Sequence, residues 1–333
     1  YEILTCDWSS DVCSSDLPAR PRAATAGPPW AGRRAAVLVA VLSAACMPAL
    51  GAVEVEDDTG QAVRLASPAQ RIVSLAPHVT ELLFAAGAGT LVVGTPQYSD
   101  YPDAAKGIAR IGGAGGFDFE RITALRPDLV VAWHSGNPAW VIERLRQIGL
   151  VLFLSEPRRL EDIASNMERL GELTGKAAAA QAASKRFRDD YRALRERYSH
   201  RSPVTVFYQV WEQPLMTING DHLISRVIAL CGGVNVFADL PALVPRIDVE
   251  AVLRKRPQAI LAAGDTDSKV LDPWRRWSQL EAVREDHLFL IPFAQIARHG
   301  PRVLLGAQRV CEALEKARKN RQAATCSTSS QGC

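Results

Sequence analysis

One loop of the chain combines an aromatic side chain with turn-forming polar residues. Trp133 follows the apolar run 129–132, and the polar turn residues 135–137 come directly after it. Open α/β sheets bind their ligands just past the carboxyl ends of their strands. The ring of Trp133 and the amide of Asn137 could hold the apolar face and the polar rim of a small molecule there. We therefore expect this loop to bind a ligand rather than to fill the core.

Histidines offer a second kind of chemistry, because neutral imidazole is a common metal ligand. His134 adjoins Trp133, and His299 lies in the last predicted loop, so either could ligate iron or cobalt. An exposed position in a loop is the alternative for each. A site for bare zinc or manganese needs several converging ligands. The candidates for such a site are His78, His134, His222 and His299, which are named because several histidines are present and not because their spacing fits a metal motif.

Motifs of catalysis are missing from the sequence. It contains no Gly-x-Ser-x-Gly, no evident Cys/His nucleophile pair and no metal-hydrolase helix motif. Asp118 and Glu250 are explained as residues of helix amino termini rather than as an acid–base pair. The glycine-rich segment 112–116 lacks the Lys-Ser/Thr of a phosphate-binding loop, so we predict a turn there. The sequence thus predicts a protein that is not an enzyme and needs no catalytic cofactor.

The helix and strand that must position the candidate ligand-binding residues belong to a segment that occurs twice in the sequence. DFERITALRPDLVVA at 118–132 returns as DVEAVLRKRPQAILA at 248–262, an offset of 130 residues. In each copy an Asp caps a short helix, a Glu lies in its first turn, and a Pro ends it. A buried parallel strand should follow. The repeat predicts two similar α/β lobes. Its identical positions are Asp118 with Asp248, Glu120 with Glu250, Arg126 with Arg256, Pro127 with Pro257 and Ala132 with Ala262.

The pattern between the repeats sets the lobe boundaries at 53–155 and 203–318. Residues 53–65 predict a β-hairpin, and Thr80 is predicted to open the helix that follows the strand ended by Pro77. Residues 156–202 carry helix-forming residues and no strand pattern, which predicts a stiff connecting helix of about 50–60 Å. Gly171 and Gly175 could interrupt it. Residues 319–333 are expected to be a disordered tail.

The first 52 residues indicate export. Arg33 and Arg34 precede the apolar run 35–45 and a series of small residues, which is typical of a secretory signal peptide. That run is too short and too rich in Ala to favour a membrane anchor. Lipid attachment at Cys46 is less favoured, because Leu42 lies one place too far upstream of it. Residues 1–17 resemble an extension foreign to the native protein.

Charge and cysteine usage narrow the partners and the compartment. The net charge of +3 is small and both signs alternate along the predicted helices, so no nucleic-acid partner is indicated. Of the seven cysteines, only Cys231 and Cys311 lie in the predicted fold. Two such thiols can pair in the oxidising compartment that an exported protein meets. Two buried free thiols are the alternative, and the spacing fits no zinc motif.

Several segments together resemble the cobalamin-binding members of the helical-backbone metal receptors, also called class III periplasmic binding proteins. They lie between residues 71 and 314: SLAPHVTELLFAAG, YSDYP, FDFERITALRPDLVVAW, SGN, LCGG, RVCEAL and GPR. The resemblance implies two lobes joined by a long helix, with the ligand in the cleft between them. It also implies a periplasmic monomer that delivers cobalamin to the permease of an inner-membrane ABC importer.

The resemblance further implies roles for individual residues. The implied cleft residues are Pro77, Tyr98 and Trp133 in the first lobe, and Trp211, Gln213 and Arg298 in the second. Asn137 adds an amide suited to the rim of a corrin ring. Cys231 and Cys311 correspond to the family's disulfide. Glu120 and Glu250 correspond to its docking glutamates, one on each lobe, which would face basic loops of a dimeric permease.

The sequence departs from the family pattern at two places. Val244 replaces a cleft tryptophan, and Ala294-Gln295 replaces an Asp-Trp pair in the last cleft loop. Trp211 could supply part of the missing aromatic surface. These departures leave open a different corrinoid, a haem or a metal–siderophore as the ligand.

Overall fold

A computed structural model of the chain describes residues 51–113, 115–265 and 269–329, with side chains as far as residue 320. These residues belong to one unit, Ala49–Cys333. The predicted signal peptide, the lipid-attachment position Cys46 and the extension 1–17 lie outside the described residues. Among the helices in the described ranges, none is both long and apolar enough to cross a bilayer.

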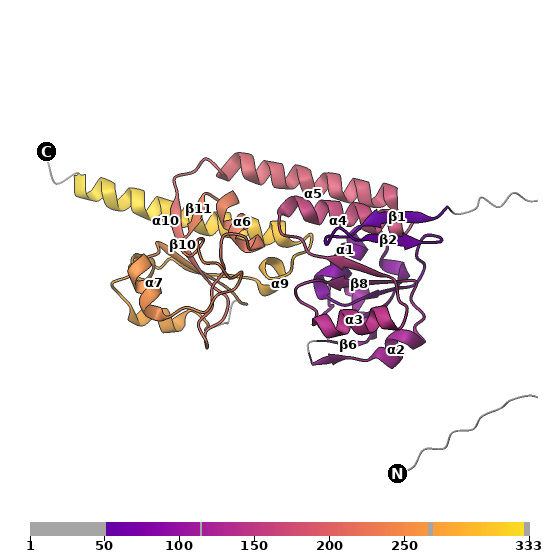
Figure 1. The fold of residues 1–333 in the computed structure, drawn as a ribbon. Coiled ribbons are helices and arrows are strands. Elements are labelled where there is room, and N and C mark those ends of the chain that lie inside the picture. The colour runs from indigo at the N-terminus through magenta and orange to yellow at the C-terminus, as the bar shows by residue number, and fades with distance from the viewer. Residues whose placement is uncertain (1–50, 114, 266–268, 330–333) are drawn as a thin grey trace, which may run out of the picture. The chain divides into compact units, whose positions relative to one another are not determined.

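The first lobe is built on a parallel sheet with the strand order β5-β4-β3-β8-β9 (Figure 1). Its strands are almost wholly buried, as expected where both faces of a sheet are covered. Trp133 ends β8 opposite Ser155 of β9, at the carboxyl edge of the sheet. The elements are β3 (Ile72–Ser74), α1 (Pro77–Ala85), η1 (Gly89–Leu91), β4 (Val92–Thr95), η2 (Asp103–Gly107), β5 (Ala109–Arg110), α2 (Phe119–Ala124), β8 (Leu129–Trp133), α3 (Ala139–Gln147) and β9 (Leu152–Ser155).

Two details of this lobe differ from the sequence-based expectation. Helix α1 begins at Pro77 rather than at Thr80, because proline fits the first turn, where its missing N–H is not needed. The glycine-rich turn carries two short antiparallel strands, β6 (Gly112–Gly113) and β7 (Gly116–Phe117). Gly112 has a φ of 101°, and a Cβ there would lie 2.2 Å from the Gly116 carbonyl oxygen. This close approach requires glycine.

The second lobe is built on a parallel sheet with the strand order β11-β10-β12-β13. The disulfide between Cys231 and Cys311 is confirmed and joins the end of α6 to α10. The elements are β10 (Val204–Gln209), α6 (Leu223–Leu230), β11 (Gly233–Asn235), α7 (Val249–Lys255), β12 (Ala259–Ala263), η3 (Asp272–Arg276), α8 (Glu281–Arg284), β13 (Leu288–Ile291), α9 (Phe293–Ile296) and α10 (Val303–Ser329). Helix α10 continues to Ser329, so the expectation of disorder from residue 319 is wrong there. The helix-forming Lys, Arg, Gln and Ala of this segment lie at its start, in residues 319–324.

The internal repeat is confirmed as the pairs α2–β8 and α7–β12. Asp118 and Asp248 both cap their helices, each accepting a hydrogen bond from the backbone N–H three residues on, at 2.8 and 2.6 Å. Arg126 and Arg256, which precede the prolines, have φ values of 45° and 46°. A following proline disfavours the right-handed helical conformation, and in both copies a left-handed residue stands between the helix and the proline. The two copies are therefore equivalent in their backbone as well as in sequence.

The connection between the lobes consists of two helices, where the sequence predicted one helix over 156–202. Helix α4 (Leu160–Leu173) packs on α1 and β1, and α5 (Ala177–Tyr198) lies against α4 and reaches α6 and α10 of the second lobe (Figure 1). The chain turns back at Gly175, whose φ is 67°. Gly171 permits the close contact, since a Cβ there would lie 2.2 Å from the Ala180 Cβ. The long inter-lobe helix of the predicted fold is therefore α5 alone, about 33 Å long.

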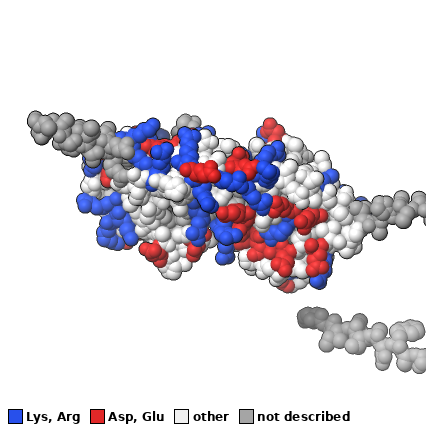
Figure 2. All heavy atoms as spheres, turned by 90° about the horizontal axis from the view of Figure 1, so that it is seen from above, with Lys and Arg blue, Asp and Glu red and all other residues white. Residues whose placement is uncertain are grey.

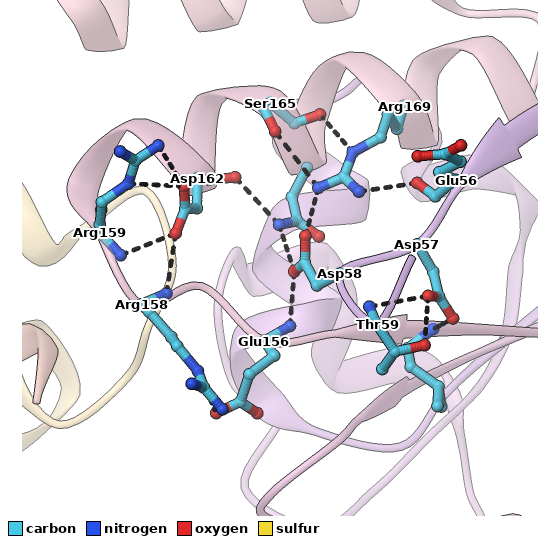
Figure 3. Close-up of polar contacts among 12 residues, drawn as sticks. Glu56, Asp57, Asp58, Thr59, Glu156, Arg158, Arg159, Asp162, Ser165 and Arg169 are labelled. Carbon is cyan, nitrogen blue, oxygen red and sulfur yellow. Dashed lines mark hydrogen bonds and ion pairs between the residues drawn. The ribbon is translucent and has the colours of Figure 1, made fainter. Parts of the chain in front are cut away.

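An antiparallel hairpin, β1 (Val53–Glu56) and β2 (Ala62–Leu65), is confirmed where the sequence predicted it. Figure 3 shows how its turn is attached. The Asp58 carboxylate accepts hydrogen bonds from the Glu156 N–H, from Asn166 Nδ2 at 2.8 Å and from Arg169. Asp57 caps its own turn and accepts a bond from the Leu154 N–H at 3.2 Å. The hairpin thereby holds the loop that follows β9 against α4.

Charges of both signs cover the face that carries α5. Figure 2 shows Asp and Glu gathered mainly over the first lobe and Lys and Arg mainly over the second. On α5 itself, Asp189 pairs with Lys185 at 2.6 Å and with Arg192 at 3.1 Å.

Candidate ligand-binding site between the lobes

Loops from the carboxyl ends of the two sheets meet where the lobes face each other. The indole of Trp133, after β8, lies 5.5 Å from the imidazole of His299, between ring centres. Arg298, beside His299, donates a hydrogen bond to the Tyr98 carbonyl oxygen at 2.9 Å. Trp133 and Tyr98 belong to the first lobe and the other two residues to the second. The contacts therefore join the lobes at the edge where parallel sheets bind ligands.

Three histidines gather at this boundary, and two of them contact Trp133. His78 in the first turn of α1 lies 5.0 Å from Trp133 and 6.2 Å from His299, between ring centres. His222, at the start of α6, lies 5.4 Å from His299. Within the described residues, three buried ring nitrogens of this group have no hydrogen-bond partner: His78 Nε2, His299 Nδ1 and Trp133 Nε1. Because unpaired buried polar atoms are uncommon, this concentration marks a candidate site for a ligand.

Burial keeps these imidazoles neutral. Desolvation, followed by the charge of Arg298, lowers the pKa of His78 to about 3. Burial lowers the pKa of His222 to about 4, and burial with the neighbouring histidines lowers that of His299 well below its usual value. A neutral imidazole retains a lone pair that can bind a metal. His222 Nδ1 already accepts a bond from the Ile224 N–H at 3.1 Å, capping α6, so its lone pair is used.

A network of charges lies beside the histidines. Glu81 of α1 has only 2% of its side chain exposed and binds two arginines of the second lobe. Arg298 Nη1 donates to Glu81 at 3.0 Å and to Asp100 at 2.7 Å. Arg302 donates to both Glu81 oxygens, at 2.9 and 2.6 Å, and its guanidinium lies 4.0 Å from the centre of the Tyr101 ring. The network ties the two lobes together.

The side chains of the other residues predicted to line the cleft make fewer contacts across the lobe boundary. Pro77 is half-buried at the start of α1, and the Tyr98 side chain is 76% exposed, with only its backbone in the network. Trp211 is 61% exposed, and its Nε1 donates to the Gln213 carbonyl oxygen at 2.9 Å. Gln213 is exposed as well. No ring contact or hydrogen bond in the described part of the chain joins Trp211 or Gln213 to the first lobe.

Asn137 has a different role from the one expected for it. Its Oδ1 accepts a hydrogen bond from the Trp133 N–H at 2.7 Å, and its Nδ2 donates to the Leu75 carbonyl oxygen at 3.0 Å. The side chain is buried, so it cannot offer a free amide to the rim of a ligand. It fixes the turn that presents Trp133. The sequence correctly marked the turn as special but did not show that its amide is used within the lobe.

The remaining histidine of the sequence-based hypotheses lies apart from the cluster. His134 is exposed, and its backbone N–H donates to the Ser155 carbonyl oxygen at 3.0 Å. In the described ranges no group of three or more His, Cys, Asp or Glu residues is arranged to hold a bare metal ion. The gathered imidazoles of His78, His222 and His299 therefore do not form a closed metal site of their own.

The predicted docking residues lie outside this region. Glu120 and Glu250 are both exposed, each in the first turn of its helix, α2 or α7. Neither carboxylate takes part in an ion pair or side-chain hydrogen bond with any described residue. Both remain free to meet an external partner.

Cavities at the lobe boundary are small. One of about 210 Å³ is lined by His222 and His299 together with Glu156 and Arg158 of the segment that follows β9. Another, of about 430 Å³, lies between Glu81, Phe187 and Arg302. Pockets for drug-sized ligands span roughly 300–1,000 Å³, and a corrinoid is larger than such a ligand. Binding of a large macrocycle therefore requires the lobes to part, which separates Trp133 from His299.

Sequence reasoning missed the residues that depend on long-range contacts. Glu81 and Arg302 are 221 positions apart and meet in one ion pair. A signal for Glu81 was present, because a carboxylate within the apolar segment ELLFAAG must find a cationic partner if it is buried. His78 had been listed by count alone, although its place at the start of α1 brings it to the cleft.

Comparison with known proteins agrees with this architecture. Residues 72–294 match the family model described as periplasmic binding protein. The vitamin B12-binding protein of Vibrio cholerae is 38% identical over 253 residues, covering 76% of this chain and 91% of the relative. That of Yersinia pestis is 38% identical over 252 residues, covering 74% and 87%.

Solved structures give the same comparison. The crystal structure of periplasmic vitamin B12 binding protein BtuF of Vibrio cholerae superposes with a TM-score of 0.71 and 37% identity, covering 76% of this chain and 99% of that one. The periplasmic heme-binding protein RhuT from Roseiflexus sp. RS-1 reaches 0.66 with 22% identity, covering 74% and 98%. The second match shows a shared fold alone.

Proposed function

This chain belongs to the periplasmic binding protein family, and from that premise we propose that it captures cobalamin or a related corrinoid between its lobes. The protein would act in the periplasm as a monomer and deliver the ligand to the permease of an inner-membrane ABC importer. It would bind without turnover. Relatives named for vitamin B12, which this chain matches over most of their length, support the choice of ligand.

The observation that carries the proposal is the group of unpaired, buried ring nitrogens around Trp133 at the lobe boundary. A corrinoid presents a broad, largely apolar face, which aromatic rings can cover, and a rim of amides that needs polar partners. When the lobes open, the exposed rings of Tyr98 and Trp211 could cover the apolar face, and the exposed amide of Gln213 could bind the rim. Arg298 retains its Nε–H for a ligand amide.

Haem is the second candidate, because His78 and His299 could both ligate its iron. The departures at Val244 and Ala294-Gln295 remove aromatic and acidic groups that the corrinoid-binding pattern expects. Gln295 instead accepts a hydrogen bond from Arg309 Nε at 2.9 Å. A changed lining of this kind suits a changed ligand.

The exposed glutamates suggest how a loaded protein would meet its permease. Glu120 and Glu250 occupy equivalent places in the two copies of the repeat, so they offer one free carboxylate on each lobe. We propose that they pair with basic loops of a dimeric permease. Charges at the rim of an interface set approach and register more than they set affinity.

Calorimetric titration of the oxidised, signal-free protein tests the function. Cyanocobalamin and haemin are titrated in parallel. Tight one-to-one binding of cyanocobalamin is the expected result. The corrinoid function is overturned if no corrinoid binds below about 10 µM, a modest affinity for a capture protein. Binding of haemin alone would replace it with the second candidate.

A further inference from the structure

The lobe boundary holds a pair of imidazoles, one from each lobe. We propose that His78 and His299 are axial ligands, on opposite faces, for the metal at the centre of the bound macrocycle. This inference rests on the proposed function and narrows its substrate class. The preferred ligand is then a flat metal macrocycle whose axial positions are held by exchangeable ligands such as water.

The spacing of the two rings supports ligation from opposite faces. Imidazole nitrogens bind metals at about 2.0–2.1 Å, so two ligands in trans place their ring centres about 6 Å apart. The centres of the His78 and His299 rings are 6.2 Å apart. The lobes would part to admit a macrocycle, and along the axis through its metal the two rings would stand at nearly the separation that they have here.

The unpaired ring nitrogens of His78 and His299 indicate that the two histidines bind a ligand. His78 is 3% exposed, yet its Nε2 has no partner, and the buried Nδ1 of His299 has none. Leaving a buried polar atom unpaired is unfavourable, so packing alone would favour apolar side chains here. Coordination satisfies both nitrogens at once.

The neighbouring residues hold the pair in place. His78 is fixed on α1 and lies close to Gly300, where an added Cβ would be 3.5 Å from the His78 Cβ. His222, itself fixed as the cap of α6, packs edgewise on His299. Trp133 touches both rings and would be the first group displaced by an entering macrocycle.

The chemistry is a simple exchange. Each step breaks a bond between the metal and water and forms a bond from the lone pair of a neutral imidazole. No electron is transferred and no proton must leave the histidine. A macrocycle with both axial positions blocked by strong ligands would bind through its face and rim alone.

Two probes with the same corrin ring separate these modes. Diaquacobinamide has exchangeable axial waters, whereas dicyanocobinamide has both positions blocked by cyanide. The full-length oxidised protein is titrated with each, with the visible spectrum and the affinity as readouts. We expect a spectral shift only for diaquacobinamide and an affinity at least about 10-fold higher for it, equivalent to about 1.4 kcal/mol.

Variants assign the ligands. His78→Ala and His299→Ala should each lower the affinity for diaquacobinamide about 10-fold or more, and the double variant should abolish the shift. Binding of dicyanocobinamide within about 3-fold of wild type shows that the variants are folded and that the corrin face is still recognised. His200→Ala, which removes an exposed imidazole after α5, is the matched control and should retain the shift.

Three results would overturn the assignment. They are equal affinity and an unchanged spectrum for both probes, a shift that survives in the double variant, and a shift lost in His134→Ala instead. Haemin distinguishes this failure from failure of the proposed function. If corrinoids do not bind but haemin gives a six-coordinate spectrum that both single variants lose, the corrinoid function is wrong and the axial pair stands. Absence of binding by all three macrocycles rejects both.

Discussion

Arg298 of the second lobe and Glu81 of the first share a hydrogen bond of 3.0 Å between Nη1 and Oε1. Their side chains are only 11% and 2% exposed, so this is a buried ion pair across the lobe boundary. Arg302, which directly precedes α10, completes it. The lobes in this closed arrangement are therefore held by charge as well as by packing.

Removal of the shared carboxylate should destabilise the closed protein strongly. Glu81→Gln leaves the buried guanidinium of Arg302 without this carboxylate and that of Arg298 with Asp100 alone. Breaking a buried ion pair typically costs about 3–5 kcal/mol. Urea denaturation followed by circular dichroism measures the loss. The control is Glu54→Gln, whose partner Arg64 is exposed, and it should leave the midpoint nearly unchanged. Equal midpoints for the two variants would show that the Glu81 pair contributes nothing.

Acid should weaken the protein through its buried histidines. The folded-state pKa is lowered from 6.5 to about 3 for His78 and to about 4 for His222. Below pH 6.5 the unfolded chain therefore binds protons that the folded chain does not. The free energy of unfolding is then greatest above about pH 6.5 and falls as the pH drops, by at most about 1.4 kcal/mol per pH unit for each histidine.

Denaturation at pH 7.5, 6.0 and 5.0 checks this dependence. His78→Gln cannot take up the proton, so its stability should decline less steeply between pH 6.5 and 5 than that of the wild type. The neighbouring Arg298 stays charged throughout the range and is common to both proteins. Parallel curves for wild type and variant would remove His78 from the explanation.

Trp133 should be more important for the ligand than for the fold. Trp133→Ala removes the aromatic surface at the end of β8 and should weaken cyanocobalamin binding by about 10- to 100-fold, in the range of interface anchor residues. Trp140→Ala is a matched control, since Trp140 is 60% exposed on the adjacent α3 and packs near Phe119. Calorimetry should find its affinity unchanged. A similar loss in both variants would place the ligand elsewhere.

The disulfide should stabilise the second lobe. Replacing Cys231 and Cys311 together by Ser opens a loop of 80 residues and should cost about 2–5 kcal/mol. Urea denaturation of the variant, compared with wild type in the presence and absence of a reductant, gives the value. Reductant should lower the midpoint of the wild type and leave that of the variant where it was. A reductant effect of the same size in the variant would contradict the assignment.

Docking to the permease should depend on the repeated glutamates. Glu120→Ala with Glu250→Ala should leave ligand affinity unchanged while lowering the stimulation of permease ATPase activity about 10-fold. Glu172→Ala with Glu196→Ala removes two other exposed carboxylates, on α4 and α5, and serves as the charge-matched control. A drop in ligand affinity would move Glu120 and Glu250 into the cleft. Equal stimulation by both double variants would end the docking proposal.

Local chemistry made the architecture predictable. Each copy of the repeat contains its own cap, its own stop signal and its own buried strand within fifteen residues. Asp118 and Asp248 cap helices wherever the lobes lie in space, because the bond they accept comes from three residues away. The β-hairpin and the disulfide were predictable for similar reasons of short-range pattern and compartment.

The site was less predictable because its contacts are distant in sequence. The carboxylate of Glu81 within an apolar segment indicated that it needs a cationic partner. The neighbouring sequence does not show which of the 39 Lys and Arg residues are the partners, so Arg298 and Arg302 could not be predicted. Gly171 and Gly175 marked a possible break, yet the reversal of the chain there depends on how α4 packs against α1. The engaged amide of Asn137 could be assigned only once Leu75 was seen to lie beside it.

The chain passes from one lobe to the other along α5, and both cysteines of the disulfide follow that crossing. A polypeptide made amino terminus first therefore completes the sheet of its first lobe without waiting for an oxidant. Cys311 is the last of the pair to arrive, and it comes with the helix that begins one residue after Arg302. Oxidation and sealing of the lobe boundary thus belong to the final stage of maturation, when the newest residues of the chain join the two halves.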